Sequence, residues 1–234
     1  MKPKLSFMNR PYIIVHMMES VDGRIDCAMT EKISPSHIYY DALEKLECPS
    51  QLMGRVTMQI HYAEGEPFVA ADPAPFGRKG IHKAVEADGY TVAVDTKGRL
   101  RWPQAECDGA PLLVITGEDC PKEYLDYLAG RGISWIAAGK HGIDLQEAMR
   151  TLCVEFGVER LAITGGGHIN GAFLAAGLID EVSVMIGPGI DGRGGMAAVF
   201  DGVDASCEKS PFLLRLESME KVGEGTVWLR YRMR

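Results

Sequence analysis

The sequence predicts an α/β fold with a mostly parallel central sheet, helices on both faces and an antiparallel strand at the carboxyl terminus. Short runs of β-branched and apolar residues alternate with helical patterns along the chain. The connections between them are short, which is typical of parallel strands joined by covering helices. In such sheets, ligands bind outside the carboxyl ends of the strands. We expect a single domain over residues 1–234, because no Pro/Gly/Ser-rich linker divides the chain.

The first half of the chain provides four of the expected strands. Residues 12–17 are continuously apolar or β-prone, as in a strand that is buried on both faces. A helix is expected to begin at Ser34 and Pro35, because Tyr39, Leu43 and Leu46 follow at helical spacing. Further strands are expected at 51–53, 91–94 and 112–115, and a further helix between Pro121 and Gly130.

The second half repeats the alternation. Strands are expected at 134–137, 160–163 and 182–186, with a helix from Ile169 to Gly177. Asp144 and Glu147 resemble a capping box, which predicts that a helix with an apolar face begins there. Apolar and polar residues alternate from 227 to 232, which indicates a half-exposed antiparallel strand.

The composition is that of an acidic globular protein. Of the 234 residues, 46% are hydrophobic, and the formal net charge is −7. Nucleic acids and anionic membranes attract clustered cations, so neither is an expected partner. Residues 1–4 are followed only by a short mixed stretch, and no apolar run reaches the roughly 20 residues of a membrane span. We therefore expect a cytoplasmic protein.

The cysteines are scattered and form no CxxC pair, so neither a metal site nor a dithiol redox motif is expected. They are Cys27, Cys48, Cys107, Cys120, Cys153 and Cys207.

The strongest local signal for ligand binding is the run from Thr164 to Ala172, in which three glycines separate a predicted strand from a predicted helix. Glycines let the backbone approach a ligand closely, and a helix start presents unpaired N–H groups with partial positive charge. The run is neither a P-loop nor the dinucleotide fingerprint. Taken alone, it is equally consistent with a phosphate cradle and with a tight connection that binds nothing.

Two further runs place polar residues after predicted strands. Gly54 is followed by Arg55, which could meet a phosphate, and by Thr57, which could cap a turn or bind a ligand. A surface arginine and a capping threonine are favoured when this run is taken alone. Asp22 and Gly23 follow the first strand and, taken alone, indicate an ordinary turn.

The three runs, in this order and at these separations, resemble the reductase domain of bacterial riboflavin-biosynthesis deaminase/reductase proteins, which has a dihydrofolate-reductase-like fold. The resemblance extends from residue 10 to about residue 192. It includes Arg10-Pro11-Tyr12, Ser20-Val21-Asp22-Gly23-Arg24, Met53-Gly54-Arg55-x-Thr57, Val94-Asp95-Thr96 with Arg99, the turn at 165–171, Gly177-Leu178-Ile179-Asp180-Glu181, and Gly187-Pro188 with Gly192. It implies a homodimer that binds NADPH. The deaminase signature H-x-E followed by P-C-x-x-C is absent from this chain.

The resemblance also implies which residues contact the cofactor. Glu19 corresponds to a position that lines the nicotinamide pocket, and the segment 166–172 to one that surrounds the pyrophosphate. The implied cofactor-binding residues are Glu19, Gly54, Arg55, Thr57, Thr96, Gly165, Gly166, Gly167, His168, Ile169, Asn170, Gly171 and Ala172. Lys97 and Arg99 are candidates for the 2′-phosphate of NADPH on charge alone.

On the substrate side, the sequence departs from the family. His16 stands where the family has lysine, Thr164 where it has a substrate-binding glutamate, and His61 where it has aspartate. The arginine-bearing stretch of the family has no counterpart in residues 62–68. Thr164 and Lys45 are the expected substrate-binding residues, and the substrate is expected to be a small pyrimidine or pterin-like heterocycle.

Hydride transfer requires the nicotinamide to be held against an electrophilic carbon, with one proton managed nearby. In the family's reaction, a ribosylamino group on a pyrimidine phosphate opens and is reduced to a ribitylamino group. Asp22 and His16 are candidates to supply the proton or orient the substrate, and His61 to meet a polar or anionic group. From the residues alone, His16 is slightly better explained as a core histidine whose hydrogen bonds are satisfied.

Three functional hypotheses follow. The chain is the riboflavin-pathway reductase, a related NADPH reductase with another substrate such as dihydrofolate, or a nucleotide-binding module without catalysis. The departures from the family on the substrate side favour a related NADPH reductase over a firm assignment to the riboflavin-pathway reductase.

Overall fold

The central sheet is built from strands of both halves of the chain. Its strands are β1 (Tyr12–Glu19), β2 (Ser50–Gly54), β3 (Gly80–His82), β4 (Thr91–Val94), β6 (Ala110–Thr116), β7 (Ser134–Ala137), β8 (Arg160–Gly165), β9 (Glu181–Ile186), β10 (Leu214–Val222) and β11 (Thr226–Met233). The short strand β5 (Glu106–Cys107) pairs with β6 beside it. The computed structural model describes residues 9–204, 206–207 and 210–234. Residues 1–4, for which no signal peptide is expected, lie outside the described residues.

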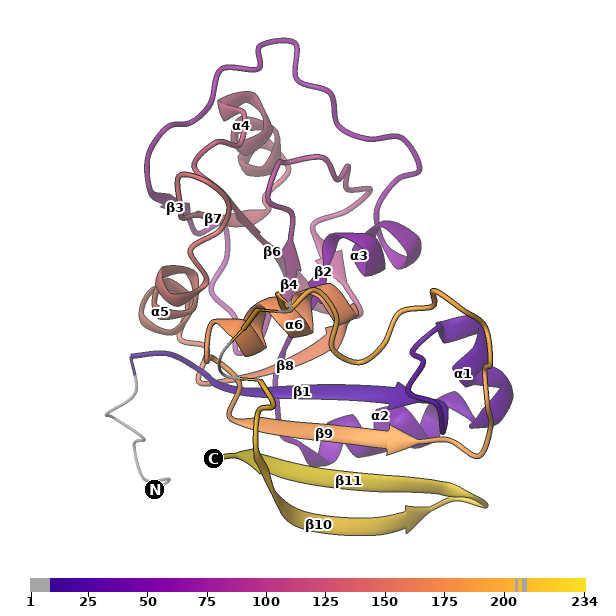
Figure 1. Ribbon diagram of the computed structural model, residues 1–234. Helices are drawn as coiled ribbons and strands as arrows, with labels where there is room; N and C mark the ends of the chain where they lie inside the picture. The colour runs from indigo at the N-terminus through magenta and orange to yellow at the C-terminus, as the bar shows by residue number, and fades with distance from the viewer. Residues whose placement is uncertain (1–8, 205, 208–209) are drawn as a thin grey trace.

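The strand order is β10-β11-β9-β1-β8-β2-β4-β6-β7-β3 (Figure 1). Pairings from β9 through β7 are parallel, whereas the outer strands β11, β10 and β3 run antiparallel to their neighbours. The predicted mostly parallel sheet is therefore confirmed, and its antiparallel carboxyl end is a two-stranded hairpin instead of one strand. The assignment of residues 1–234 to one domain stays a prediction.

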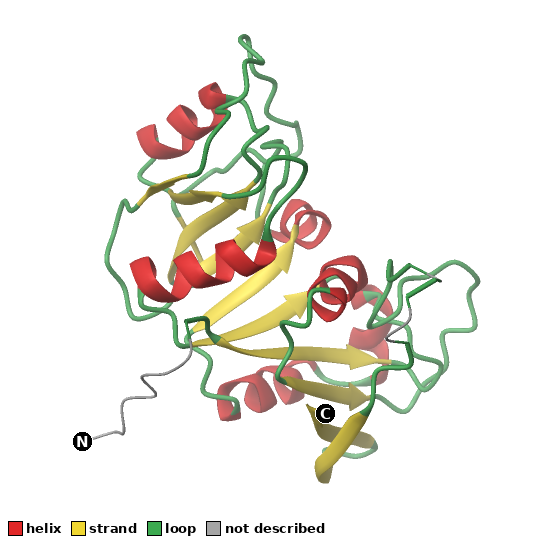
Figure 2. Cartoon of the chain, turned by 60° about the vertical axis from the view of Figure 1, so that its left-hand side comes forward, coloured by secondary structure: helices red, strands yellow, loops and turns green. Residues whose placement is uncertain are grey.

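Helices cover both faces of the sheet, as predicted (Figure 2). They are α1 (Cys27–Ile33), α2 (Ser36–Lys45), α3 (Arg55–His61), α4 (Lys122–Gly130), α5 (Leu145–Phe156) and α6 (Gly167–Ala175). No helix in the described part of the chain is both long enough and apolar enough to cross a membrane.

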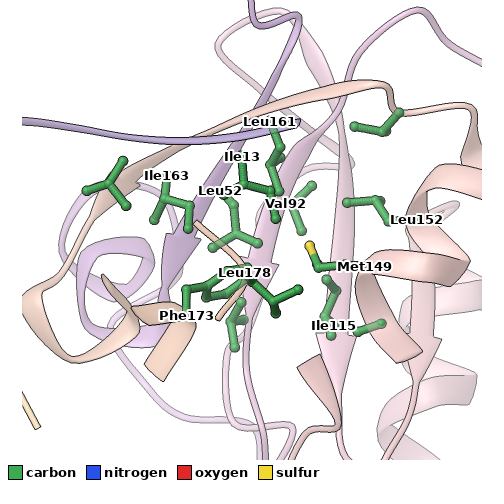
Figure 3. Packing of buried hydrophobic residues seen from close by; sticks show 14 of the residues in the cluster. Ile13, Leu52, Val92, Ile115, Met149, Leu152, Leu161, Ile163, Phe173 and Leu178 are labelled. Atoms are coloured by element: carbon green, nitrogen blue, oxygen red, sulfur yellow. The ribbon is translucent and has the colours of Figure 1, made fainter. Parts of the chain in front are cut away.

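The larger core cluster lies between the sheet and the two helices α5 and α6. Ile13 and Leu161 from the strands pack with Met149 and Leu152 of α5 and with Phe173 of α6 (Figure 3). These side chains are almost completely buried. Complete burial of each such side chain stabilises the fold by about 1.5–3 kcal/mol relative to exposure. The cluster fixes both helices against the strands that precede them.

The opposite face carries two separate clusters. One packs Trp102 and Tyr124 against β4 and β6, under α4. The other packs Leu43 of α2 against β1 and Trp228 of β11. Because the two clusters are separate, the sheet between them is open to the cavity described below.

The expected strands and helices are present, but five elements were not predicted. These are α1, α3, β3, β5 and β10. The helices α1 and α3 have seven residues each, which is too short for an apolar repeat to be diagnostic. Strand β10 contains a register shift between Leu216 and Ser218, which interrupts the alternation that would have revealed it. The predicted cap of α5 is confirmed, because Asp144 Oδ1 accepts a hydrogen bond of 3.0 Å from Glu147 N.

Helix α6 is held unusually close to the loop at residues 196–202. A Cβ atom on Gly171 would lie 1.8 Å from the carbonyl oxygen of Asp201, and one on Gly167 would lie 2.2 Å from that of Ala198. Asn170 Nδ2 donates to Val199 O at 2.6 Å. These glycines are therefore required by contact between protein segments.

We predict that Gly171→Ala lowers the free energy of unfolding by about 1–3 kcal/mol, because the added methyl group must displace backbone. Gly130→Ala is the matched control: this glycine also lies in a helix, and a Cβ there meets open space. The control should be neutral or stabilising by up to about 1 kcal/mol. Urea denaturation of the two variants and the wild type measures both effects, and equal stabilities would contradict the packing account.

Candidate active site

The candidate site lies at the carboxyl ends of the parallel strands. β2 ends at Gly54 and β8 ends at Gly165, and each strand leads directly into a helix. β1 lies beside β8 in the sheet and ends nearby at Glu19. The sequence predicts a ligand site outside the carboxyl ends of the strands, and in the structure this is the edge where β1, β2 and β8 end.

A cavity of about 380 Å³ opens on the face of the sheet between α2 and α3. Residues of α1, α2, α3 and the turn between β5 and β6 form its walls. The lining residues are Met17, Met18, Ile25, Cys27, Thr30, Glu31, Ser34, Ser36, Tyr39, Tyr40, Gln51, Met53, Thr57, His61, Tyr62, Asp108 and Thr164.

The floor of this cavity follows from the alternation of side chains along β8. Leu161 and Ile163 point into the core under α5 and α6, so Ala162 and Thr164 face the other side. Thr164 Oγ1 is buried there and has no hydrogen-bond partner among the described residues. A buried hydroxyl without a partner is costly, so this atom is suited to a bond with a ligand.

Thr57 connects the cavity to the glycine turn. Its side chain lines the cavity, and it also lies so close to the turn that a Cβ on Gly165 would be 2.8 Å from Thr57 Oγ1. A Cβ on Gly54 would lie 3.4 Å from the side chain of Ile169 in α6, at van der Waals contact. A molecule extended along the turn would therefore reach the cavity at Thr57 and Thr164.

The turn itself offers an uncapped helix start. Gly166 is the N-cap residue of α6, with φ +93°, and among the residues that the structure describes α6 has no side-chain N-cap hydrogen bond. The backbone N–H groups of Gly167, His168 and Ile169 can therefore bind an anion. His168 and Ala172 are exposed.

Three residues of this segment that were predicted to bind the cofactor are packed against another part of the protein. Gly167, Asn170 and Gly171 are buried against residues 198–201. Asn170 Oδ1 has no hydrogen-bond partner in the described part of the chain.

The other predicted cofactor residues surround the same edge. Arg55 begins α3 and is exposed. Thr96 follows β4, and its backbone carbonyl accepts a bond of 3.1 Å from Thr116 Oγ1. Asp95 is fully buried and accepts hydrogen bonds from the backbone N–H groups of Arg99 and Leu100, which fixes the turn that carries Lys97.

Glu19 lies at the end of β1, where its backbone carbonyl accepts a hydrogen bond from Gly187 N. Burial raises the pKa of its carboxyl group. Its side chain does not line the cavity, although Met17 and Met18 before it do.

The carboxylate of Asp22 joins the turn after β1 to the backbone at residues 191–192. Ser20 Oγ donates to Asp22 Oδ1 at 2.6 Å, and the backbone N–H groups of Asp191 and Gly192 donate to its two oxygens at 2.9 Å each. The Ser20 hydroxyl, followed by these two N–H groups, lowers the pKa of the Asp22 carboxyl. Asp22 also lies outside the cavity lining. A carboxylate with a lowered pKa is a poor proton donor at neutral pH, so the expected catalytic role has no support from the geometry.

His16 likewise does not line the cavity, although it lies behind Tyr39, which does. Its ring is fully buried and stacks on Tyr39, with 4.5 Å between ring centroids. Nδ1 lies 2.9 Å from Ser183 Oγ, and Nε2 lies 3.3 Å from the Tyr39 carbonyl oxygen. His16 therefore has the surroundings of a core histidine whose two nitrogens are bonded, and the expected catalytic role of His16 has no support from this geometry.

Of the residues expected on the substrate side, two line the cavity and one does not. His61 and Thr164 line the cavity. Lys45 does not: its ammonium lies 5.7 Å from the centre of the Trp228 ring, so the predicted contact with substrate has no support from the geometry.

Sequence reasoning missed several wall residues, chiefly Tyr39, Tyr62 and Asp108. The Tyr62 hydroxyl donates a short hydrogen bond to Asp108 Oδ2. Asp108 is followed by Gly109, a pair that indicates a hairpin turn. Nothing in the sequence indicates that this turn reaches α3.

Comparison with known proteins identifies relatives across nearly the whole chain. A family model described as the RibD C-terminal domain matches residues 11–228. A 2,5-diamino-6-ribosylamino-4(3H)-pyrimidinone 5′-phosphate reductase from Methanothermobacter thermautotrophicus is 28% identical over 225 residues, covering 93% of this chain and 96% of the relative. A protein of the same name from Aquifex aeolicus is 24% identical, covering 90% and 92%.

Solved structures show the same architecture. A pyrimidine reductase-like protein from Corynebacterium diphtheriae has a TM-score of 0.69 at 18% identity, over 97% of this chain and 93% of that one. RibD from Acinetobacter baumannii has a TM-score of 0.67 at 21% identity over 97% of this chain, which spans 59% of the length of that chain. These likenesses confirm the predicted dihydrofolate-reductase-like α/β fold.

The burial of His16 generates a prediction about pH. Burial lowers its pKa to about 4, whereas a histidine in an unfolded chain titrates near about 6.5. As the pH falls through this window, the unfolded state takes up the proton first, so stability present at pH 7 is lost. We expect His16 to contribute a loss of roughly 3 kcal/mol in the free energy of unfolding between pH 7 and pH 4.

Urea denaturation at several pH values measures this loss. His16→Gln should be less stable than the wild type at pH 7 but should depend less steeply on pH. His37→Gln, at an exposed position of α2, should keep the slope of the wild type. Identical slopes for His16→Gln and the wild type would show that His16 does not titrate with a lowered pKa.

Proposed function

Because this chain belongs to the RibD C-terminal domain family, we propose that it is an NADPH-dependent reductase of a ribosylaminopyrimidine. The observation that carries the proposal is the junction at Thr57 and Thr164, where the glycine turn meets the cavity. A dinucleotide and a heterocycle must meet at one point for hydride transfer, and this junction provides such a point. The names of the relatives supply the substrate class.

The residues present fit a nicotinamide dinucleotide. The uncapped start of α6 would offer N–H groups for the pyrophosphate, and Thr164 Oγ1, which has no partner among the described residues, would offer a polar contact to the substrate. Lys97 and Arg99 are exposed in the turn after β4 and are assigned to the 2′-phosphate. Bound NADPH would supply the hydride.

The remaining task of the protein is to hold the substrate and to move one proton. Opening of the ribosylamino group gives a C=N carbon, the former C1′, which accepts the hydride while the nitrogen takes up a proton. His61 is the member of the predicted catalytic set that lines the cavity, and it is assigned contact with the substrate. The rings of Tyr39, Tyr40 and Tyr62 line the cavity and can pack against a flat heterocycle.

A related reductase with another substrate, including dihydrofolate, is the second candidate. It is favoured by the threonine hydroxyl at position 164 on the cavity floor, where the resemblance implies a glutamate. The homodimer and the cytoplasmic location remain predictions.

We predict that NADPH raises the melting temperature of the protein and that NADPH is oxidised when the diaminoribosylaminopyrimidinone is added. Dihydrofolate is the comparison substrate. Thr57→Val keeps the shape of the side chain against Gly165 but removes the hydroxyl, and should lower kcat/KM about tenfold or more. Thr151→Val, on the opposite side of the core in α5, is the control and should retain activity.

No stabilisation by NADPH or NADH would refute the reductase proposal. Stabilisation without turnover of either substrate would favour a binding module.

A separate prediction concerns the choice between NADPH and NADH. The double variant Lys97→Gln/Arg99→Gln should weaken NADPH binding about 10–100-fold, because two cations that face a phosphate are removed, and should leave NADH binding nearly unchanged. Arg101→Gln is the control, since Arg101 lies in the same segment but pairs with Glu64 at 3.0 Å. Fluorescence titration with both cofactors measures the effect. Equal weakening of both cofactors would place the 2′-phosphate elsewhere.

A further inference from the structure

We propose that Gln51, on the floor of the cavity, is a specificity-determining residue whose side-chain amide binds the pyrimidinone ring of the substrate. This inference rests on the proposed function and deepens it, because it assigns the contact that recognises the heterocycle. It concerns the ring alone and therefore applies to a substrate that carries a 5′-phosphate. Gln51 is not among the residues that the sequence predicts for the site.

Gln51 occupies an interior position of the sheet, where an apolar residue is usual. Its strand, β2, is paired in parallel with β8 on one side and with β4 on the other. Leu52 packs into the core under α5 and α6, so Gln51 and Met53 face the opposite side, and both line the cavity. Strands that are covered on both faces are normally apolar throughout, because an unpaired polar group there is unfavourable.

The surrounding protein leaves the amide of Gln51 available to a ligand. Its backbone N–H donates to Tyr90 O at 3.0 Å, but no residue that the structure describes forms a hydrogen bond with its side chain. Its neighbours across the sheet are Ala162 on β8 and Thr91 on β4. Ala162 has no polar side chain, and the hydroxyl of Thr91 donates to Cys107 O at 3.1 Å.

Thr164 provides a second polar group on the same floor. It follows Ala162 by two residues in β8, so the two side chains share a face. With strands about 4.8 Å apart and a rise of about 3.3 Å per residue, the Cα atoms of Gln51 and Thr164 are separated by about 8 Å. A flat ring with its substituents has a similar span. One ring can therefore contact both the amide of Gln51 and the buried Thr164 Oγ1, which has no partner among the described residues.

A side-chain amide recognises a particular pair of ligand groups. Its Oε1 accepts and its Nε2 donates, and the two atoms lie side by side. A ring N–H next to a ring carbonyl presents the complementary pair, so two parallel hydrogen bonds can form, as they do between glutamine and the edge of adenine. A 4(3H)-pyrimidinone has this arrangement at N3 and C4, and the names of the relatives specify such a ring. An apolar residue at position 51 would form neither bond.

The test uses two compounds that differ only at this edge of the ring. One is the diaminoribosylaminopyrimidinone 5′-phosphate, and the other is its 4-methoxy analogue, in which N3 has no hydrogen and the oxygen on C4 is methylated. We expect the NADPH complex of the wild type to bind the first compound about tenfold or more tightly than the analogue. Gln51→Leu should bind the two with similar affinity and should lower kcat/KM for the first about tenfold or more, with NADPH binding unchanged. Gln104→Leu, at an exposed position outside the cavity lining, is the control and should keep the preference of the wild type.

The melting temperature of the ligand-free protein distinguishes ligand binding from a role in the fold. Because the amide has no partner among the described residues, Gln51→Leu should leave the melting temperature unchanged or raise it by about 1–4 °C. A variant that loses the preference between the two compounds and also melts at a lower temperature would contradict the inference, because the amide would then be needed by the fold.

Equal affinity of the wild type for the two compounds would overturn the inference, and so would a preference that persists in Gln51→Leu. Both results leave the proposed reductase intact if the first compound is still reduced. If NADPH binds but neither compound binds or reacts, the inference and the assigned substrate both fail while cofactor binding stands. If NADPH does not bind, the proposed function itself fails.

Discussion

The close contact between two strand-to-helix turns determines most of what this site can do. Gly165 at the end of β8 lies against Thr57 of α3, and Gly54 at the end of β2 lies against Ile169 of α6. A Cβ atom on Gly165 would force Thr57 to move, whereas one on Gly54 would just reach van der Waals contact with Ile169. The two helix starts are thereby held side by side, so the polar atoms at their ends share one small region. A single side chain, Thr57, consequently belongs to both the glycine turn and the cavity.

The cavity exists because the covering layer on one face of the sheet is discontinuous. α5 and α6 seal the other face with one large cluster. On the cavity face, the packing under α2 and the packing under α4 stay separate. The sheet between them is exposed at the points where β2 and β8 end. The same alternation of side chains that buries Ile163 therefore presents Thr164 to the cavity.

Much of this arrangement could be predicted from local sequence patterns. Buried strands are marked by continuous apolar runs, and the start of α5 by Asp144 with Glu147, because these signals depend on neighbours in sequence. The rule that ligands bind outside the carboxyl ends of parallel strands predicted the location of the site, and Thr57 and Thr164 both line the cavity there. Such signals can be recognised because they lie within a few consecutive residues.

The rest depends on contacts between distant segments. His16 and Asp22 were attractive as catalytic groups because they flank the end of β1, but their partners, Ser183 and the backbone at 191–192, are more than 160 residues away. Sequence patterns do not record such pairings. The same limitation hid Asp108, which joins the site only because Tyr62 reaches it from α3. Polar residues near a strand end are therefore ambiguous until their hydrogen-bond partners are known.

The segment from Asp191 to Asp201 links two sides of the site that are otherwise separate. Its beginning is bound by the carboxylate of Asp22 after β1, and its end is packed against Gly167 and Gly171 of α6. The position of α6 therefore depends on a segment that is itself anchored at the turn after β1, so these two parts of the chain are joined by contacts as well as by the sheet.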